Sequence, residues 1–326
     1  MRKSTKIWLI IAAVFVLAGC VLFAGVMMEL DWNFTKLSTV KYATNTHTVT
    51  EDFAHISVAA DTTADVTFAV SADDTVSVVC FEEAGAEHTV GVADDTLTIH
   101  RKGVRKWYRH IGIHFQTPKI TVYLPAGAYG DLTVATDTGD VSVPADFRFA
   151  TVDIAVSTGR VTCAASAAGN MKIQTTTGNI RVSDVAVGAL DLAVSTGKID
   201  VSDVACVGDV AVAVSTGKAH LTDVTCGRLT STGNTGDLTL CAVVATDAFS
   251  ITRSTGDITF DACDAATLTV TTDTGDIEGT LLTEKVFVTH TDTGRVDVPD
   301  TTSGGRCQLT TDTGDIRISL ASSKEN

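Results

Sequence analysis

Basic residues are scarce in this chain. Its 24 lysines and arginines are outnumbered by 39 aspartates and glutamates, which gives a formal net charge of −15. Binding to nucleic acid requires Lys and Arg clustered over most of one face, where they neutralise phosphates. The composition therefore argues against nucleic acid as the main partner.

Motifs of catalysis and cofactor binding are also missing. The sequence has no nucleophile elbow, P-loop, dinucleotide fingerprint or carboxylate pair of defined spacing. Asp-Thr-Gly, first found at Asp137, is the active-site tripeptide of aspartic proteases, but here it belongs to a repeat that often replaces the Asp. We therefore expect a protein that is not an enzyme and needs no cofactor. The alternative is an enzyme acting on polysaccharide, because a β-helix can assemble carboxylates from different coils.

Proline occurs only four times, whereas Thr, Val, Asp, Ala and Gly are abundant, as is typical of β-structure. A Thr-Gly dipeptide recurs ten times between residues 138 and 314, in steps of 19 or 20 residues. Self-similarity at a fixed short period indicates a solenoid, in which each repeat is one coil stacked on the previous one. We predict an all-β fold, a parallel β-solenoid (β-helix) of about ten coils over residues 131–320.

The register of each coil follows from its apolar positions. In every copy, the residues two places after the glycine and seven places before it are suited to burial, and apolar residues alternate around both. This period of two predicts one strand on each side of the turn, and the more variable corner leaves room for a third short strand. Glycine is needed at the turn because it adopts positive φ without a Cβ clash. The structural turn residues are Gly139, Gly159, Gly178, Gly197, Gly217, Gly236, Gly256, Gly275, Gly294 and Gly314.

The N-terminal part has a different character. Cations in residues 1–6 indicate a cytoplasmic N-terminus, and the uncharged, apolar residues 7–28 are long enough for one transmembrane helix. We expect a polar linker at 29–51, and a β cap at 52–130 that covers the raw edge of the first coil. Residues 321–326 form a polar tail.

A second interpretation of this segment involves Cys20. Leu-Ala-Gly-Cys ending at Cys20 matches the lipobox of bacterial lipoproteins, whose cleavage leaves a lipidated cysteine at the N-terminus. The residues after Cys20 stay apolar, which favours the uncut helix. Both interpretations place the remaining chain outside a bacterial cell membrane, anchored at its N-terminal side.

Two groups of charged residues are candidate sites. Near the C-terminus, acids flank the stacked turns, and a hard cation such as Ca²⁺ would relieve their repulsion with oxygen ligands. The alternative is that these are solvated surface turns. The candidate calcium ligands are Asp273, Asp276, Asp292, Asp312 and Asp315.

The second group is basic and aromatic, and it contains no acid. Such a segment suits contact with anionic lipid headgroups or an anionic wall polymer, although a solvated loop between cap strands explains it equally well. Its members are Arg101, Lys102, Arg105, Lys106, Trp107 and Arg109.

The cysteines of the repeats are expected to be free thiols. Cys206 and Cys226 both lie nine residues after a turn glycine, so we predict that they stack in adjacent coils. Their side chains would then be parallel, which fits a disulfide poorly.

The repeated Ser-Thr-Gly-Asp/Lys-Ile/Val turns, the single apolar helix before them and the segment Trp32–Leu37 resemble a bacterial family of β-strand-repeat proteins. This family is catalogued as "putative adhesin" and as domain of unknown function 4097. The resemblance implies a β-solenoid on a membrane anchor, with a role in adhesion or envelope sensing and with no catalytic residue.

We therefore expect a single-pass, membrane-anchored cell-surface protein that acts as an adhesion or envelope-interaction module. Its partner would be a cell-wall polymer, another protein or a second copy of itself. The alternative function is a self-assembling envelope scaffold, because the last coil ends close to Asn326 and offers an open sheet edge.

Overall fold

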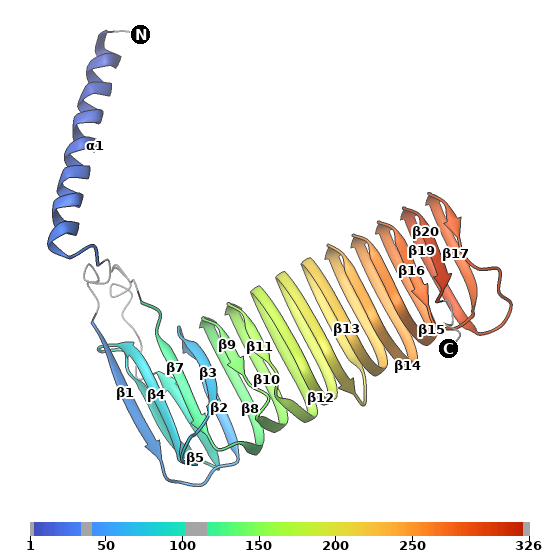
Figure 1. Ribbon diagram of the computed structural model, residues 1–326, viewed down its shortest axis with the longest axis horizontal. Helices are drawn as coiled ribbons and strands as arrows, with labels where there is room; N and C mark the ends of the chain where they lie inside the picture. The colour runs from blue at the N-terminus through green and yellow to red at the C-terminus, as the bar shows by residue number, and fades with distance from the viewer. Residues whose placement is uncertain (1–2, 34–40, 102–115, 322–326) are drawn as a thin grey trace.

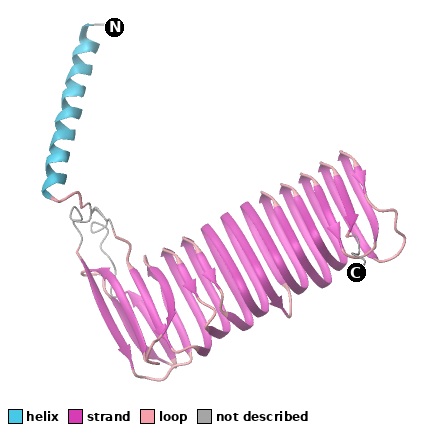
Figure 2. Cartoon of the chain, viewed as in Figure 1, coloured by secondary structure: helices cyan, strands magenta, loops and turns pink. Residues whose placement is uncertain are grey.

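The computed structural model describes residues 3–33, 41–101 and 116–321, and it consists of one helix and a long β-solenoid (Figures 1 and 2). Helix α1 (Lys3–Glu29) contains the apolar span Ile7–Glu29, with mean hydropathy 2.9. By length and composition this helix suits either a membrane anchor or a signal sequence. It stands beyond the end of the solenoid at which the cap lies.

The solenoid has two main faces, which meet at the Thr-Gly turns. The face before the turns begins with the hydrogen-bonded series β5 (His88–Ala93), β6 (Thr96–Arg101), β2 (His55–Thr62), β8 (Gly127–Thr138) and β10 (Phe147–Thr158). The face after the turns begins with β1 (Tyr42–Val49), β4 (Val76–Glu83), β7 (Lys119–Leu124), β3 (Asp65–Val70), β9 (Val141–Val143) and β11 (Val161–Cys163).

The middle of the rod is a regular stack. The chain there runs continuously around the coils in β12 (Ser166–Cys206), β13 (Val210–Thr235), β14 (Leu238–Thr255) and β15 (Ile258–Thr274). Neighbouring coils pair in parallel and in register, so that Thr196 lies beside Thr216 and Gly197 beside Gly217. The apolar side chains of both faces fill one continuous core. The predicted all-β solenoid is confirmed, including a third short strand, as where Val204 pairs with Val224.

The turn glycines are required for two reasons. All ten have positive φ, between 123° and 159°. In addition, a Cβ on Gly178 would lie 1.8 Å from the carbonyl oxygen of Gly159 in the preceding coil. Glycine therefore permits both the backbone conformation and the close stacking of the turns.

A second corner of the coils also uses the left-handed conformation. The corner residues have φ between 51° and 59°, and they are Asp184, Asp203, Asp223, Ala242 and Ala262. Aspartate tolerates this region better than most residues, because its short side chain makes local hydrogen bonds. The Asp-to-Ala change occurs between the third and the fourth of these corners.

The cap extends both faces of the solenoid with antiparallel strands. On one face β4 pairs antiparallel with β7 and with β1, and on the other β5 pairs antiparallel with β6. Residues 42–49, which we expected to lie in a linker, form β1. They do so because Asn45, His47 and Val49 alternate with exposed residues and face inward, opposite β4.

Coils at the N-terminal end are not stacked in sequence order. Strands β2 and β3 pair with β8 and β9 of the first regular coil. On their other side they pair with β6 and β7, which come later in the sequence. The coil formed by residues 55–70 is therefore inserted between its two successors.

The C-terminal end shows the same exchange. Strands β16 (Ile277–Leu281), β17 (Lys285–Thr293), β18 (Val296–Asp297), β19 (Gly305–Thr313) and β20 (Ile316–Leu320) form this end. The last coil in sequence, β19 and β20, packs against β15 and β16, and β17 and β18 lie outside it (Figure 1). The sequential stacking that we expected is therefore wrong for the last two coils. We call β17 and β18 the outer coil and β19 and β20 the inserted coil.

The chemistry of the two coils explains this order. Thr289 of the outer coil pairs with Leu309, at a position where Val270 stands on the other side. Leu309 is fully buried, whereas Thr289 is only partly buried. Placing the more apolar coil inside removes more apolar surface from water.

Candidate functional site

The predicted anionic-surface contact falls almost entirely outside the described residues. Arg101, at the end of β6, is partly buried, whereas Lys102, Arg105, Lys106, Trp107 and Arg109 are not among the described residues. The segment joins β6 to β7, and those strands occupy the two faces of one coil. Its role in binding stays a prediction.

The predicted calcium ligands lie along the C-terminal turns in the order of the exchanged coils. After the glycines, Asp276 lies beside Asp315, and Asp315 lies beside Arg295. Before them, Thr274 pairs with Thr313 and Thr313 with Thr293, which places Asp312 between Asp273 and Asp292. Asp292 also forms an ion pair with His290 at 3.0 Å.

The carboxylates after the glycines have a structural role that the sequence interpretation missed. The Oδ1 atom of Asp276 accepts a hydrogen bond from the backbone N–H of Asp315 at 2.7 Å, and Asp315 accepts one from Arg295 at 2.8 Å. The same bond joins Asp65 to Asp140, Asp140 to Arg160, Asn179 to Lys198, Asp237 to Asp257 and Asp257 to Asp276. Each of these aspartates, and Asn179, accepts a hydrogen bond from a turn amide of the adjacent coil, and the calcium site stays a prediction.

A shallow groove crosses five coils on the face before the turns. It has a volume of about 360 Å³ and runs from Ala135 to Ser215. Its floor consists of small or aliphatic side chains such as Ala155, Ala193 and Val194. One rim carries exposed hydroxyls of Ser157, Thr176, Ser195 and Ser215. The groove thus offers a row of hydroxyls in four successive coils, and Asp137 holds the same position in the first coil. The row of alanines beside it is interrupted by Gln174.

The two predicted stacked thiols lie in neighbouring coils. Ala205 pairs with Thr225, which brings the next residues, Cys206 and Cys226, into adjacent positions. All eight cysteines are free thiols in the structure. Burial raises the pKa of Cys226 to about 12, which suppresses the reactive thiolate.

Arg253 is an unusual polar residue within the solenoid core. It is 1% exposed, and it donates hydrogen bonds to the Ser231 hydroxyl at 2.8 Å and to the Thr232 carbonyl at 3.0 Å. Its guanidinium occupies the space beside Gly233, where a Cβ would collide with it. Burial lowers the pKa of Arg253 to about 10. These hydrogen bonds join the coil that contains Arg253 to the preceding coil, so the role of Arg253 is structural.

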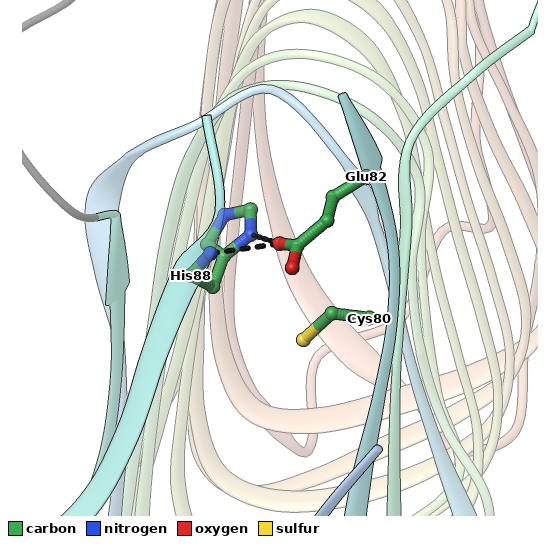
Figure 3. Close-up of side chains that lie close together, drawn as sticks. All are labelled: Cys80, Glu82 and His88. Atoms are coloured by element: carbon green, nitrogen blue, oxygen red, sulfur yellow. Dashed lines mark hydrogen bonds and ion pairs between the residues drawn. The ribbon is translucent and has the colours of Figure 1, made fainter. Parts of the chain in front are cut away.

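A second polar group lies in the cap, where Cys80, Glu82 and His88 meet (Figure 3). Cys80 and Glu82 project from the same side of β4, and His88 begins β5 on the opposite face of the solenoid. One atom of each, the thiol sulfur, a carboxylate oxygen and a ring nitrogen, lies within 4.8 Å of the others. Among the described residues, this is the only group of three or more potential ligands from His, Cys, Asp and Glu that is brought so close.

Hydrogen bonds hold Glu82 at the centre of this group. Its Oε2 accepts a bond from the backbone N–H of His88 at 2.7 Å and lies 2.6 Å from His88 Nδ1. Its Oε1 accepts a bond from Asn45 Nδ2 at 2.6 Å. Burial, followed by the charge of Glu82, raises the pKa of Cys80 to about 12. The thiol is therefore protonated at neutral pH.

Sequence reasoning missed this group because its members lie outside the repeats and come from two strands. The available signal was polar residues at inward positions: Cys80 and Glu82 alternate with outward residues of β4, and His88 follows after a short turn.

Comparison with known proteins identifies one family. A family model described as Toastrack DUF4097 matches residues 53–211 and 197–326. No curated protein sequence matches the chain.

Several solved structures resemble the chain at low identity. A putative lipid binding protein from Parabacteroides distasonis is 17% identical, with a TM-score of 0.49, and the match covers 74% of this chain and 98% of that one. A putative adhesin from the same organism is 13% identical, with a TM-score of 0.47 and coverage of 86% and 98%. A putative adhesin from Parabacteroides merdae is 15% identical, with a TM-score of 0.45 and coverage of 86% and 97%.

Proposed function

This chain belongs to the Toastrack DUF4097 family, and we propose that it is a non-enzymatic module anchored in a bacterial membrane, whose solenoid contacts a polymer of the cell envelope. The proposal rests on the order of the helix and the solenoid along the chain. An apolar helix at Ile7–Glu29 precedes a straight stack of about ten coils, which at about 4.8 Å per coil reaches about 48 Å from its base. Such an arrangement holds a surface at a fixed distance from a bilayer.

The groove from Ala135 to Ser215 is the contact surface that we favour. Its hydroxyls recur once per coil over four successive coils, so a linear polymer lying along the rod would meet a hydroxyl at each of these steps. Hydroxyls both donate and accept hydrogen bonds, which suits a glycan. The small side chains of the floor let an extended chain approach closely.

The test is binding of the full-length chain, purified in detergent, to isolated wall polysaccharide. Ala193→Lys fills the groove with a long side chain, and we expect it to weaken binding at least tenfold. Ser202→Lys is the matched control, because Ser202 is a partly exposed strand residue of the same coil on the other main face. Equal binding by the wild type and both variants would remove the groove from the proposal.

The basic segment provides a second arm of the same experiment. Neutralising the five cations from Arg101 to Arg109 should reduce binding to anionic vesicles and leave binding to a neutral glycan unchanged. Loss of glycan binding in this variant alone would move the contact site from the groove to the cap. An absence of binding to polymer and vesicles in every form would contradict the envelope contact altogether.

Self-assembly is a second candidate, and the outer coil favours it. Within the described parts of the chain, strands β17 and β18 pair with a neighbour on one edge only, which leaves their other edge open. Val286, Val288 and Val296 of this coil are exposed, and so is the adjacent Leu282. A second copy that places its own outer coil here would continue the sheets and bury these side chains.

Sedimentation over a wide range of protein concentrations tests this candidate. We expect a reversible dimer that Val288→Lys disrupts, because the substitution places a charge at the junction. Val244→Lys is the control, since Val244 is also exposed but lies in the middle of the rod. A monomer at every concentration would exclude assembly through the outer coil.

A further inference from the structure

The cap contains a group of side chains that the proposed function does not use. Cys80 is fully buried, Glu82 is 1% exposed and His88 is 7% exposed. They are a thiol, a carboxylate and an imidazole, which are the three ligand types that bind zinc in proteins. Their position is specific, since β4 belongs to one face of the solenoid and β5 to the other.

The buried carboxylate of Glu82 depends on His88 for its charge compensation. Among the described residues, no lysine or arginine forms an ion pair with Glu82, and its ionic contact there is with His88. Burying an ionised carboxylate is costly unless it is paired and hydrogen-bonded. A divalent cation bound to a thiolate, a carboxylate and a neutral imidazole would leave the buried group without net charge.

The two ring nitrogens of His88 have different surroundings. Nδ1 faces the carboxylate of Glu82 (Figure 3). Nε2 is buried and has no hydrogen-bond partner in the described structure. Nδ1 is therefore the nitrogen that His88 presents to Glu82 and Cys80.

We propose that Cys80, Glu82 and His88 bind a thiophilic divalent metal ion of the zinc class, which ties the two faces of the solenoid together at its N-terminal end. The ion lies between Cys80 Sγ, a carboxylate oxygen of Glu82 and His88 Nδ1. Bond lengths of about 2.0–2.3 Å place ligand atoms about 3.5 Å apart in a tetrahedral site. The three atoms, within 4.8 Å of one another, need only small shifts to reach this spacing.

Binding replaces hydrogens with the metal. The thiol of Cys80 and the Nδ1 atom of His88 each release a proton to solvent, and the neutral ring keeps its hydrogen on Nε2. The hydrogen bond between Nδ1 and Glu82, now 2.6 Å, opens by about 1 Å as the ion takes its place. No oxidation or reduction takes place. Asn45 stands opposite Cys80 in the register of β1 and β4 and holds the other oxygen of Glu82, so it orients that ligand. Water completes the coordination.

Cobalt titration of the full-length chain under reducing conditions tests the site. Co²⁺ bound to a cysteine thiolate gives a charge-transfer absorption in the near ultraviolet, and we expect one equivalent to produce it and one equivalent of Zn²⁺ to abolish it. Cys80→Ser should eliminate the band. Cys241→Ser is the control and should retain it, because Cys241 is a partly buried thiol in a middle coil.

Glu82→Gln guards against a variant that merely fails to fold, since it preserves the size of the side chain. It should weaken the binding of Co²⁺ at least tenfold while the far-ultraviolet circular dichroism stays unchanged. A folded wild type that gives no thiolate band would overturn the proposal. So would a band of equal strength in Cys80→Ser, which would mark the ion as adventitious.

Discussion

The two ends of the solenoid differ in how they cover their terminal coils. At both ends the coil nearest the chain terminus is inserted between two others, with residues 55–70 at one end and 305–320 at the other. Beyond that, the ends differ. The outermost N-terminal coil is covered by the antiparallel strands β1, β4 and β5, whereas the outer coil at the C-terminal end has an open edge.

The difference shows that burying a terminal coil and covering the outermost sheet edge are two separate requirements. Insertion gives a terminal coil two neighbours and so buries its apolar residues, as with Leu309 and Ile316 of the inserted coil. Insertion does not cover the sheet edge of the coil that then lies outermost. Only the N-terminal end adds strands for that purpose, and this leaves the C-terminal end as the surface through which another chain would pair.

Exchange of the last coils has the clearest expected consequence. Spin labels at Thr269 and Gln308 should lie one coil apart, as should labels at Gln308 and Val288, at about 4.8 Å between strands. Labels at Thr269 and Val288 should lie two coils apart and interact much more weakly. The measurement is dipolar broadening of the spin-label spectrum, with the accessible Cys20 and Cys241 replaced by serine. Strongest broadening for Thr269 with Val288 would show that the coils follow sequence order.

Equivalent core substitutions at the two ends should differ in cost. Leu97→Ala, in the covered N-terminal coil, removes a fully buried side chain and should lower the unfolding free energy by about 2–5 kcal/mol. Phe287→Ala, in the outer coil, should cost at most about 2 kcal/mol, because its side chain is only partly buried. Denaturant titrations followed by circular dichroism compare the two. Equal losses would mean that the outer coil is as well covered as the N-terminal one.

An ion pair attaches the outer coil to the rod. Lys285 is 3% exposed, and its Nζ lies 2.6 Å from Asp264 Oδ1. Asp264→Asn should cost about 2–3 kcal/mol, because it leaves a buried cation without its partner. Limited proteolysis between residues 282 and 304 should then become faster. Adding Lys285→Met should restore resistance, since an apolar side chain needs no partner there, and failure of this rescue would argue against the ion pair.

The smallest effect concerns the corners of the middle coils. Ala242 has a φ of 51°, a conformation that asparagine tolerates better than alanine. Ala242→Asn should therefore stabilise the fold by about 0.5–1 kcal/mol. Asp203→Ala, the reverse change at the equivalent corner, should destabilise it by a similar amount. Thermal unfolding of both variants checks this, and a shift of the same sign in both would contradict the backbone explanation.

Much of the fold could be predicted because the turn glycines impose a period. Gly178 and its counterparts mark one coil each, and the apolar positions around them define which side chains face inward. The order of the coils was harder to predict, since any coil presents nearly the same backbone edge to any other. One residue carried the information, because Thr289 marks a coil that is less suited to the interior.

The sites were less predictable than the fold. The stacked acids Asp276 and Asp315 were expected to repel each other, which led to the prediction of a bound cation. Nothing in the sequence shows that each carboxylate faces a backbone amide of the adjacent coil. The group in the cap depends on the approach of β5 to β4 across the core, where Glu82 meets His88. That contact follows from the packing of two faces and has no periodic signature.

Insertion of the last coil also determines how the rod responds to mechanical force. A pull on the C-terminus acts first on β20, which is hydrogen-bonded to β16 on one edge and to β18 on the other. Both rows of bonds bear the load together, in shear, so the strand resists peeling. A pull on the N-terminal helix instead reaches β1, an edge strand that, among the described residues, is bonded only to β4. It then reaches β2, which is held on both edges. Tension on the anchor would detach β1 first and stop at the coil formed by residues 55–70.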